Sequence, residues 1–200
     1  MMGRFIKWNM TKKGKWLLLA MSMLLLAVLG CSNENKLEKV IRKELASGVR
    51  NDTLFLGLEF GINQQEFYDH CWALNKQGLV REGAENMSVR YMFKDSLENP
   101  ISFDFYTDRL ADESIHRYYA SFYYYAWVLN RHLQSDRLFP MLVPILMNWY
   151  GGNEPFYQII DGKKHMYKID GNRMIDLVIH NESTVVAIFS DLSYYYPEKQ

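Results

Sequence analysis

The sequence predicts an α+β fold in which helices pack on antiparallel sheets in two layers. Several segments after residue 88 alternate apolar and polar residues, which is the period of a strand with one buried face. Two other segments carry helix signals: a capping pattern at Asn63 and a compact apolar run that stops at Gly151-Gly152. Each helix precedes about three strands. This order predicts tandem units, each a helix plus a three- to four-stranded antiparallel sheet.

The first 30 residues have the layout of a secretory signal peptide. Five basic residues precede Trp16–Leu29, an apolar run of 14 residues, and small Gly30 follows it. A membrane-spanning helix needs about 20 apolar residues, so this run is short for an anchor. An uncleaved anchor and an ordinary signal cut at another position remain alternatives. Translation could start at Met1 or at Met10, because three lysines follow Met10.

Cys31 directly follows this apolar run. Val28-Leu29-Gly30-Cys31 resembles the lipobox of bacterial lipoproteins. The resemblance implies cleavage before Cys31 and acylation of its thiol and of the new amino terminus with fatty acids such as palmitate. We therefore expect a lipid-anchored protein of the cell envelope. Ser32-Asn33 lacks the aspartate that retains such proteins in the inner membrane, which favours the outer membrane of a Gram-negative bacterium.

The charge of the exported part excludes one class of partner. The chain has 23 basic and 23 acidic side chains, but the signal contains five basic residues and no acid. Removing it leaves 23 − 5 = 18 basic against 23 acidic residues, a formal charge of −5. Nucleic-acid binding requires a basic footprint, so we expect no nucleic-acid partner. With Cys31 acylated, Cys71 is the one remaining thiol, and no intramolecular disulfide can form.

Residues 31–52 read as a lipidated polar tether with a short amphipathic helix. Leu37, Val40, Ile41 and Leu45 have helical spacing. A first helix-plus-sheet unit is expected over residues 53–126, beginning with a strand from Leu54 to Phe60.

A helix follows this strand, from Gln64 to about Gln77. Asn63 and Glu66 form a capping box, and Ile62 and Phe67 occupy the positions of a hydrophobic staple. Gly78 ends the helix. The strands expected next are 89–93, 101–105 and 114–125.

A second unit is expected over residues 127–200. Trp127 to Tyr150 reads as helical with a break near Ser135-Asp136. Because proline is tolerated in the first turn of a helix, Pro140 predicts that its second part starts near Phe139. The strands expected next are 156–160, 165–169, 174–180 and 184–192, separated by Asp161-Gly162, by Asp170-Gly171 and by Asn181-Glu182-Ser183.

The helix edges carry a resemblance at the level of family. Phe60-Gly-Ile-Asn-Gln-Gln-Glu-Phe67 and Asn148-Trp-Tyr-Gly151 are similar to helix edges in uncharacterised envelope lipoproteins. Those proteins have the tandem helix-plus-sheet architecture of the beta-lactamase inhibitor protein and of the small outer-membrane assembly lipoproteins. The resemblance covers most of residues 54–192. It implies a two-layer fold with a protein-facing sheet, and no catalytic residue is carried over.

No catalytic or metal-binding constellation is visible, so we expect a protein that is not an enzyme and needs no cofactor. The five histidines are scattered and lack metal-ligand spacing. His70 and Cys71 are adjacent on a helix and point about 100° apart, and Cys71 shares a face with Phe67 and Leu74. The alternative is a small-ligand carrier or hydrolase with a site between the helix and sheet layers. Converging His and Asp side chains in a polar pocket would favour that alternative.

The tyrosine-rich segment 114–125 is the candidate binding surface. Alternation places Tyr119, Tyr123 and Tyr125 on one face and Tyr118, Phe122 and Tyr124 on the other. Exposed tyrosines in a row suit contact with a protein or a glycan. The alternative is that these rings only stabilise the sheet through cross-strand pairs.

The lipid anchor can be tested directly. Cys31→Ser should leave an uncut precursor that takes up no labelled fatty acid, because no thiol remains to be acylated. Membrane retention should fall as well. Stable anchoring requires two membrane-binding signals, and each buried methylene of an acyl chain contributes about 0.8 kcal/mol of binding free energy. Metabolic labelling and gel mobility measure both effects. Equal mobility and equal retention of variant and wild type would contradict the assignment.

Overall fold

This computed structural model describes residues 35–84, 87–93, 99–108, 114–125, 130 and 132–197. The chain divides into two units, residues 1–38 and 39–200, and the first unit is described only from residue 35. The expected signal peptide, the acylated Cys31 and the first residues of the tether lie outside the described residues. The predicted helix after the tether is confirmed as α2, Lys36–Ala46.

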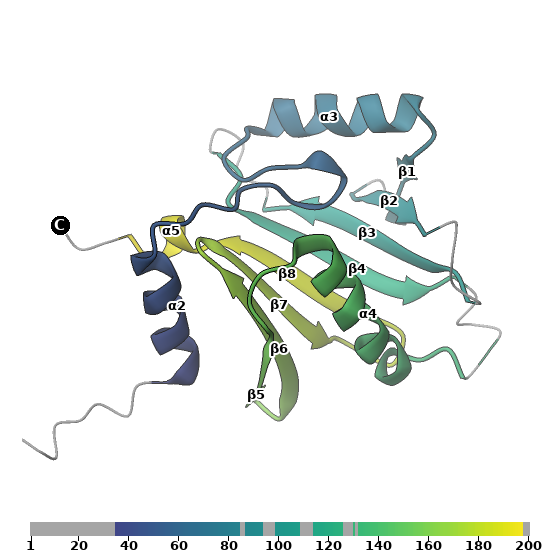
Figure 1. The fold of residues 1–200 in the computed structure, drawn as a ribbon. Helices are drawn as coiled ribbons and strands as arrows, with labels where there is room; N and C mark the ends of the chain where they lie inside the picture. Colours follow the sequence, from purple (N-terminus) through teal and green to yellow (C-terminus); the bar gives the residue numbers. More distant parts are fainter. Residues whose placement is uncertain are drawn as a thin grey trace, which may run out of the picture. The chain divides into compact units, whose positions relative to one another are not determined.

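The body of the second unit is one antiparallel sheet of eight strands (Figure 1). The strand order is β1-β2-β3-β4-β8-β7-β6-β5, so β4 pairs with β8 at the centre. The strands are β1 Val80–Glu82, β2 Val89–Met92, β3 Ile101–Thr107, β4 Arg117–Tyr124, β5 Phe156–Ile160, β6 Lys163–Asp170, β7 Arg173–Ile179 and β8 Val185–Asp191.

The α+β class is confirmed, with four helices and one open antiparallel sheet in the described residues. The finer prediction of tandem units is not clearly shown. Each half contains one long helix followed by four consecutive strands, but the β4–β8 pairing joins all of them in a single sheet. The unit boundaries at residues 53–126 and 127–200 therefore stay predictions.

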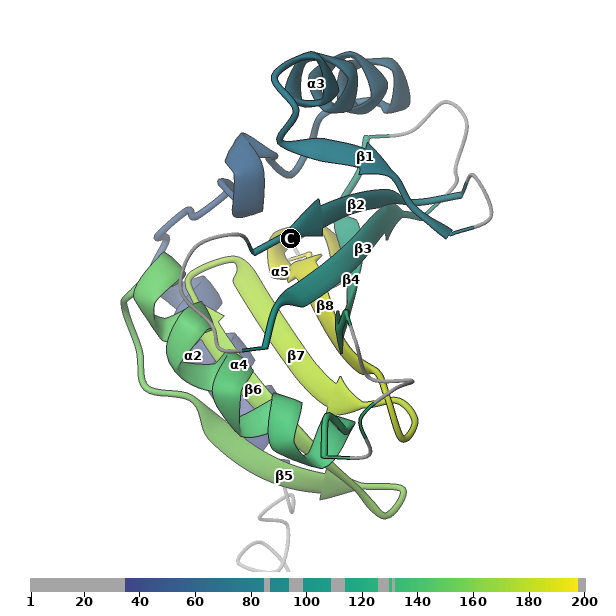
Figure 2. The ribbon, with the colours of Figure 1, turned by 90° about the vertical axis from the view of Figure 1, so that its right-hand side faces the viewer.

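Two long helices pack on one face of this sheet. α3, Gln64–Lys76, lies beside β1 at one end, and α4, Ser135–Tyr150, lies along the strands of the second half (Figure 2). The predicted capping box of α3 is confirmed: Asn63 accepts from the Glu66 backbone N–H at 2.9 Å, and Glu66 accepts from the Asn63 N–H at 2.8 Å. Gly78 has φ +69, the left-handed conformation expected after a helix end.

The predicted start of α4 at Phe139 is wrong, because the helix begins four residues earlier at Ser135. Ser135 is held by the turn between β7 and β8: its hydroxyl donates to the Asn181 carbonyl at 2.6 Å. An apolar stripe then buries completely at Leu138, Leu142 and Leu146. The two prolines lie on the exposed side of the helix, where the missing backbone donors do not disturb this stripe.

The strand predicted from Leu54 to Phe60 is also wrong. The segment contains a single turn of 3-10 helix, η1 Phe55–Gly57, and one isolated bridge between Thr53 and Glu59. Leu56 and Gly57 both have positive φ, which extended strands do not adopt. The apolar residues of the segment bury as a plug over the sheet, with Leu54, Phe55 and Leu58 at most 5% exposed.

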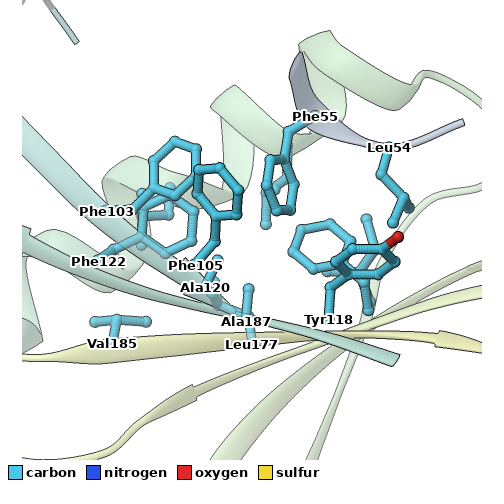
Figure 3. Close-up of a cluster of buried hydrophobic side chains, with 14 of the residues drawn as sticks. Leu54, Phe55, Phe103, Phe105, Tyr118, Ala120, Phe122, Leu177, Val185 and Ala187 are labelled. Carbon is cyan, nitrogen blue, oxygen red and sulfur yellow. The ribbon is translucent and has the colours of Figure 1, made fainter. Parts of the chain in front are cut away.

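Phe55 is the centre of that plug (Figure 3). Its ring packs edge-on against Phe103, Phe105 and Phe189, with centroids 5.1–5.2 Å apart. Beneath the rings the sheet carries Ala120 and Ala187, which are cross-strand partners of the β4–β8 pair. Two short elements were not predicted from the sequence: strand β1 and the C-terminal helix α5, Leu192–Tyr195.

The plug makes a quantitative prediction. Phe55→Ala should lower the free energy of unfolding of the chain from Ser32 onward by about 3–5 kcal/mol, because it removes a buried ring and leaves a cavity. Denaturant unfolding of the chain from Ser32 onward measures the change. Met141→Ala, an exposed apolar residue of α4, is the control and should stay within about 0.5 kcal/mol of wild type. A Phe55 variant as stable as the control would show that η1 does not plug the core.

Candidate functional site

The two faces of the sheet differ in what covers them. One face packs against α3, α4 and η1 and contributes the buried strand residues of the core. We call the opposite one the open face; it is open over the central strands, whereas toward β6 its residues Tyr167 and Ile169 are only 4% and 2% exposed. It is formed in its central strands by Arg90, Asp104, Tyr106, Tyr119, Ser121, Tyr123, Met174, Asp176, Val178, Val186 and Ile188.

The predicted alternation of the tyrosine-rich strand is confirmed. Tyr118, Phe122 and Tyr124 are buried on the helix side of β4. Tyr119 and Tyr123 are half-buried on the open face, and Tyr125, directly after the strand, is 56% exposed. The structure therefore places Tyr119 and Tyr123 on one face of β4, with Tyr125 exposed just beyond its end. Their contact with a partner stays a prediction.

Tyr119 belongs to an aromatic pair that was not predicted from the sequence. Its ring stacks on Tyr106 of β3, its direct cross-strand neighbour, with centroids 5.1 Å apart and planes at 12°. Tyr106 is 40% exposed. The alternation of Ile101, Phe103 and Phe105 already contains the signal, since it assigns the next residue to the opposite face.

Tyr123 is fixed by a charged network. Its hydroxyl donates to the Asp104 carboxylate at 2.9 Å, and Arg90 donates to both oxygens of the same carboxylate at 2.7 and 2.8 Å. Such a two-pronged pair holds both side chains in one geometry. Burial and the neighbouring Asp104 carboxylate raise the pKa of Tyr123, so its hydroxyl stays protonated and keeps donating.

The second half of the sheet carries a similar polar group on β6 and β7. Asp176 accepts from a ring nitrogen of His165 at 2.8 Å, and Tyr167 also bonds to this carboxylate. The rings of His165 and Tyr167 stack at 5.7 Å. Burial raises the pKa of Asp176, while its hydrogen bonds oppose that change. The group is satisfied internally, which indicates a role in fixing the sheet surface.

An apolar strip separates the two polar groups. Val186 of β8 pairs with Val178 of β7, and Ile188 pairs with Tyr119 of β4. All four side chains are half-buried in the isolated chain. At the start of β4, the ring of Tyr195 lies 4.0 Å from the Arg117 guanidinium, and Tyr194 stacks on His116 at 4.0 Å. Aromatic residues of α5 therefore border this strip.

The helix side of the sheet contains a groove of about 730 Å³ beneath α3. It has a mainly apolar lining, with polar side chains of both charges at several points. Its walls include Phe67, Cys71 and Trp72 of α3 together with Val89 and Phe105 of the sheet. Its volume lies in the range of small-molecule sites. Among the described residues that line the groove there is no histidine; His70 of α3 bonds instead to the Leu56 carbonyl at 2.8 Å.

Among the described residues, no group of three or more His, Cys, Asp or Glu side chains is placed to hold a metal ion. Cys71 is 7% exposed, which confirms its expected role as a small core residue. Burial raises its thiol pKa to about 12, so the nucleophilic thiolate is scarce at neutral pH.

One buried lysine was not predicted from the sequence. Lys168 is completely buried and donates to the carbonyls of Gly151 and Asn153 and to Asp170. The two carbonyls lie just after the last residue of α4, whose final carbonyls lack partners within the helix, and Asp170 is on β6 itself. Every partner of the ammonium group is thus part of the fold, and Lys168 ties α4 to β6.

Comparison with known proteins adds no family. Neither protein-family models, nor curated proteins, nor solved structures gave a significant match to the chain. In the part of the chain that the structure describes, no helix has the length and apolar character needed to cross a membrane.

The Tyr123 network makes the next prediction. Tyr123→Phe should lower the free energy of unfolding by about 1.5–3 kcal/mol, because a hydrogen bond to a buried carboxylate is lost. Tyr125→Phe is the matched control: Tyr125 is exposed, so its change should be within about 0.5 kcal/mol. Thermal or denaturant unfolding of both variants measures the difference. Equal stabilities would mean that the hydroxyl of Tyr123 does not support the fold.

Proposed function

We propose that the chain is a lipid-anchored protein of the bacterial cell envelope whose open sheet face binds a protein partner without catalysis. The anchor is supported by the signal-like first 30 residues and by Gly30-Cys31. The outer membrane is favoured by Ser32-Asn33. In this proposal the membrane is reached through the acyl chains of Cys31, and the sheet is left to face a partner.

The observation that carries the binding proposal is the composition of the open face. Its centre is an apolar and aromatic strip across β4, β8 and β7, including Tyr119, Ile188 and Val186. Polar groups that are already satisfied flank it on both sides, at Arg90–Asp104 and at His165–Asp176. An apolar centre with aromatic residues and a polar rim is the anatomy of a protein interface.

A protein suits this surface better than a glycan. Aromatic rings serve both kinds of partner, but branched aliphatic side chains such as Val178, Val186 and Ile188 add nothing to sugar stacking. They do contribute to apolar interface cores. The tandem arrangement expected from the resemblance supports the same conclusion. Two halves with the same order of helix and strands place β4 and β8 side by side, so one surface can extend across both.

A second candidate function is a carrier of a small apolar ligand, and the groove beneath α3 is the observation that favours it. Its size and lining suit a neutral apolar molecule. Trp72 lines the groove and would report an occupant through its fluorescence. A ligand-induced change that leaves partner capture untouched would separate this function from the first.

The binding proposal is tested by matched charge insertions. Ile188→Arg places a charge in the centre of the open face and should abolish capture of the partner from envelope extracts. Ile159→Arg is the control: this residue is 66% exposed on β5 and points to the helix side, so capture should persist. Both variants should keep a native melt, because a partly exposed arginine can extend its charge into water.

Tyr106→Ala provides an independent check if Ile188→Arg proves unstable. It removes an exposed ring from the same face and should weaken capture, since aromatic anchors often contribute 2 kcal/mol or more. Folded Ile188→Arg and Tyr106→Ala proteins that both capture the partner like wild type would refute the proposed surface.

A further inference from the structure

From Lys39 onward, helix α2 packs on the domain. Ile41, on one side of the helix, is 2% exposed. The Glu44 carboxylate accepts a hydrogen bond from the backbone N–H of Gly171, in the turn between β6 and β7, at 3.1 Å. The chain that follows is also held: the Asn51 N–H donates to the Asn172 side chain at 2.6 Å. Residues 39–46 therefore have a fixed orientation relative to the sheet.

The opposite side of α2 is basic. Lys39 and Lys43 lie one turn apart, Arg42 lies beside Lys43, and all three are exposed. Of the two acids in the helix, Glu44 is turned toward Gly171. Glu38 lies one turn before Arg42 and offsets part of that charge, so Lys39 and Lys43 form the centre of the basic side. Such a concentration is notable in an exported chain whose formal charge is −5.

The position of α2 in the chain brings this basic side close to the proposed anchor. Four residues lie between Cys31 and the first residue of α2, Lys36, so the link has five residue-to-residue steps. A fully extended chain spans at most about 3.6 Å per residue, so this link reaches no more than ~18 Å. Acyl chains on Cys31 would therefore keep α2 beside the bilayer surface, where anionic lipid headgroups attract lysine and arginine.

We propose that Lys39, Arg42 and Lys43 dock α2 on anionic lipid headgroups and so fix the orientation of the domain on its membrane. This inference rests on the proposed lipid anchor. The acyl chains supply the affinity, and the basic side selects one orientation. Each basic residue near an anionic surface strengthens association about fivefold, so three together favour the docked orientation by roughly a hundredfold at low salt.

The experiment uses the full lipidated chain in vesicles of phosphatidylcholine, with or without phosphatidylglycerol. An Ala46→Cys variant carries a fluorophore on the basic side of α2, and nitroxide headgroup lipids report its depth by quenching. Cys71 is buried and its raised pKa keeps it largely unlabelled. Quenching should be several-fold stronger with phosphatidylglycerol and should disappear at high salt.

Two charge-matched double variants provide the controls. Lys39→Glu/Lys43→Glu should lose the extra quenching. Lys76→Glu/Arg81→Glu, at the end of α3 and on β1, changes the charge equally and should retain it. Equal quenching on both vesicle types, or equal loss in both double variants, would overturn the docking proposal.

Vesicle flotation tests the lipid anchor separately from the docking of α2. A chain that floats with both vesicle types has its anchor, whatever the quenching shows. A chain that floats only with phosphatidylglycerol lacks a working anchor but still docks through charge. That result supports the docking proposal and contradicts the anchor. A chain that floats with neither overturns both the anchor and the docking.

Discussion

The antiparallel pairing of β4 with β8 is the interaction on which the rest of the structure depends. It is the one strand pair that joins residues before position 125 to residues after position 184 within the sheet. On the helix side the pair presents Ala120 opposite Ala187, both completely buried. These small residues leave room for the η1 plug, so the ring of Phe55 can contact Phe105 and Phe189 from the two halves at once.

The same pairing determines what the open face can do. Since side chains alternate, burying Tyr118 and Phe189 on the helix side places Tyr119 and Ile188 together on the opposite one. The apolar strip at the centre of the sheet is thus a direct consequence of how the core is closed. The flanking polar groups are internally bonded, which makes the surface rigid before any partner arrives.

Local signals in the sequence predicted the parts of the fold that local chemistry decides. The Asn63–Glu66 box and Gly78 define α3, and alternation correctly predicted that Tyr118 and Tyr124 are buried. The errors arose where tertiary contacts prevail. Leu56 and Gly57 both adopt a positive φ, and the segment buries as a plug rather than pairing as a strand. The start of α4 depends on Asn181, 46 residues away in the chain.

In the candidate site, too, local spacing predicted the correct face, whereas contacts between strands were not predicted. Tyr119 and Tyr123 were assigned to the correct face from spacing alone. Their neighbours were not, because the Arg90–Asp104 pair and the Tyr106 stack depend on the register between strands. No local pattern encodes that register. The buried ammonium group of Lys168 was missed for a related reason: its partners come from the end of a helix that only the folded sheet brings within reach.

The most direct measurement of the central claim is photo-crosslinking from the open face in intact cells. A benzoylphenylalanine placed at Val186, in the middle of the strip, should form a discrete adduct with a protein partner. The same group at Tyr157, which is 46% exposed on the helix side of β5, should form none. An adduct from Tyr157 but not from Val186, or none from either position, would contradict the account.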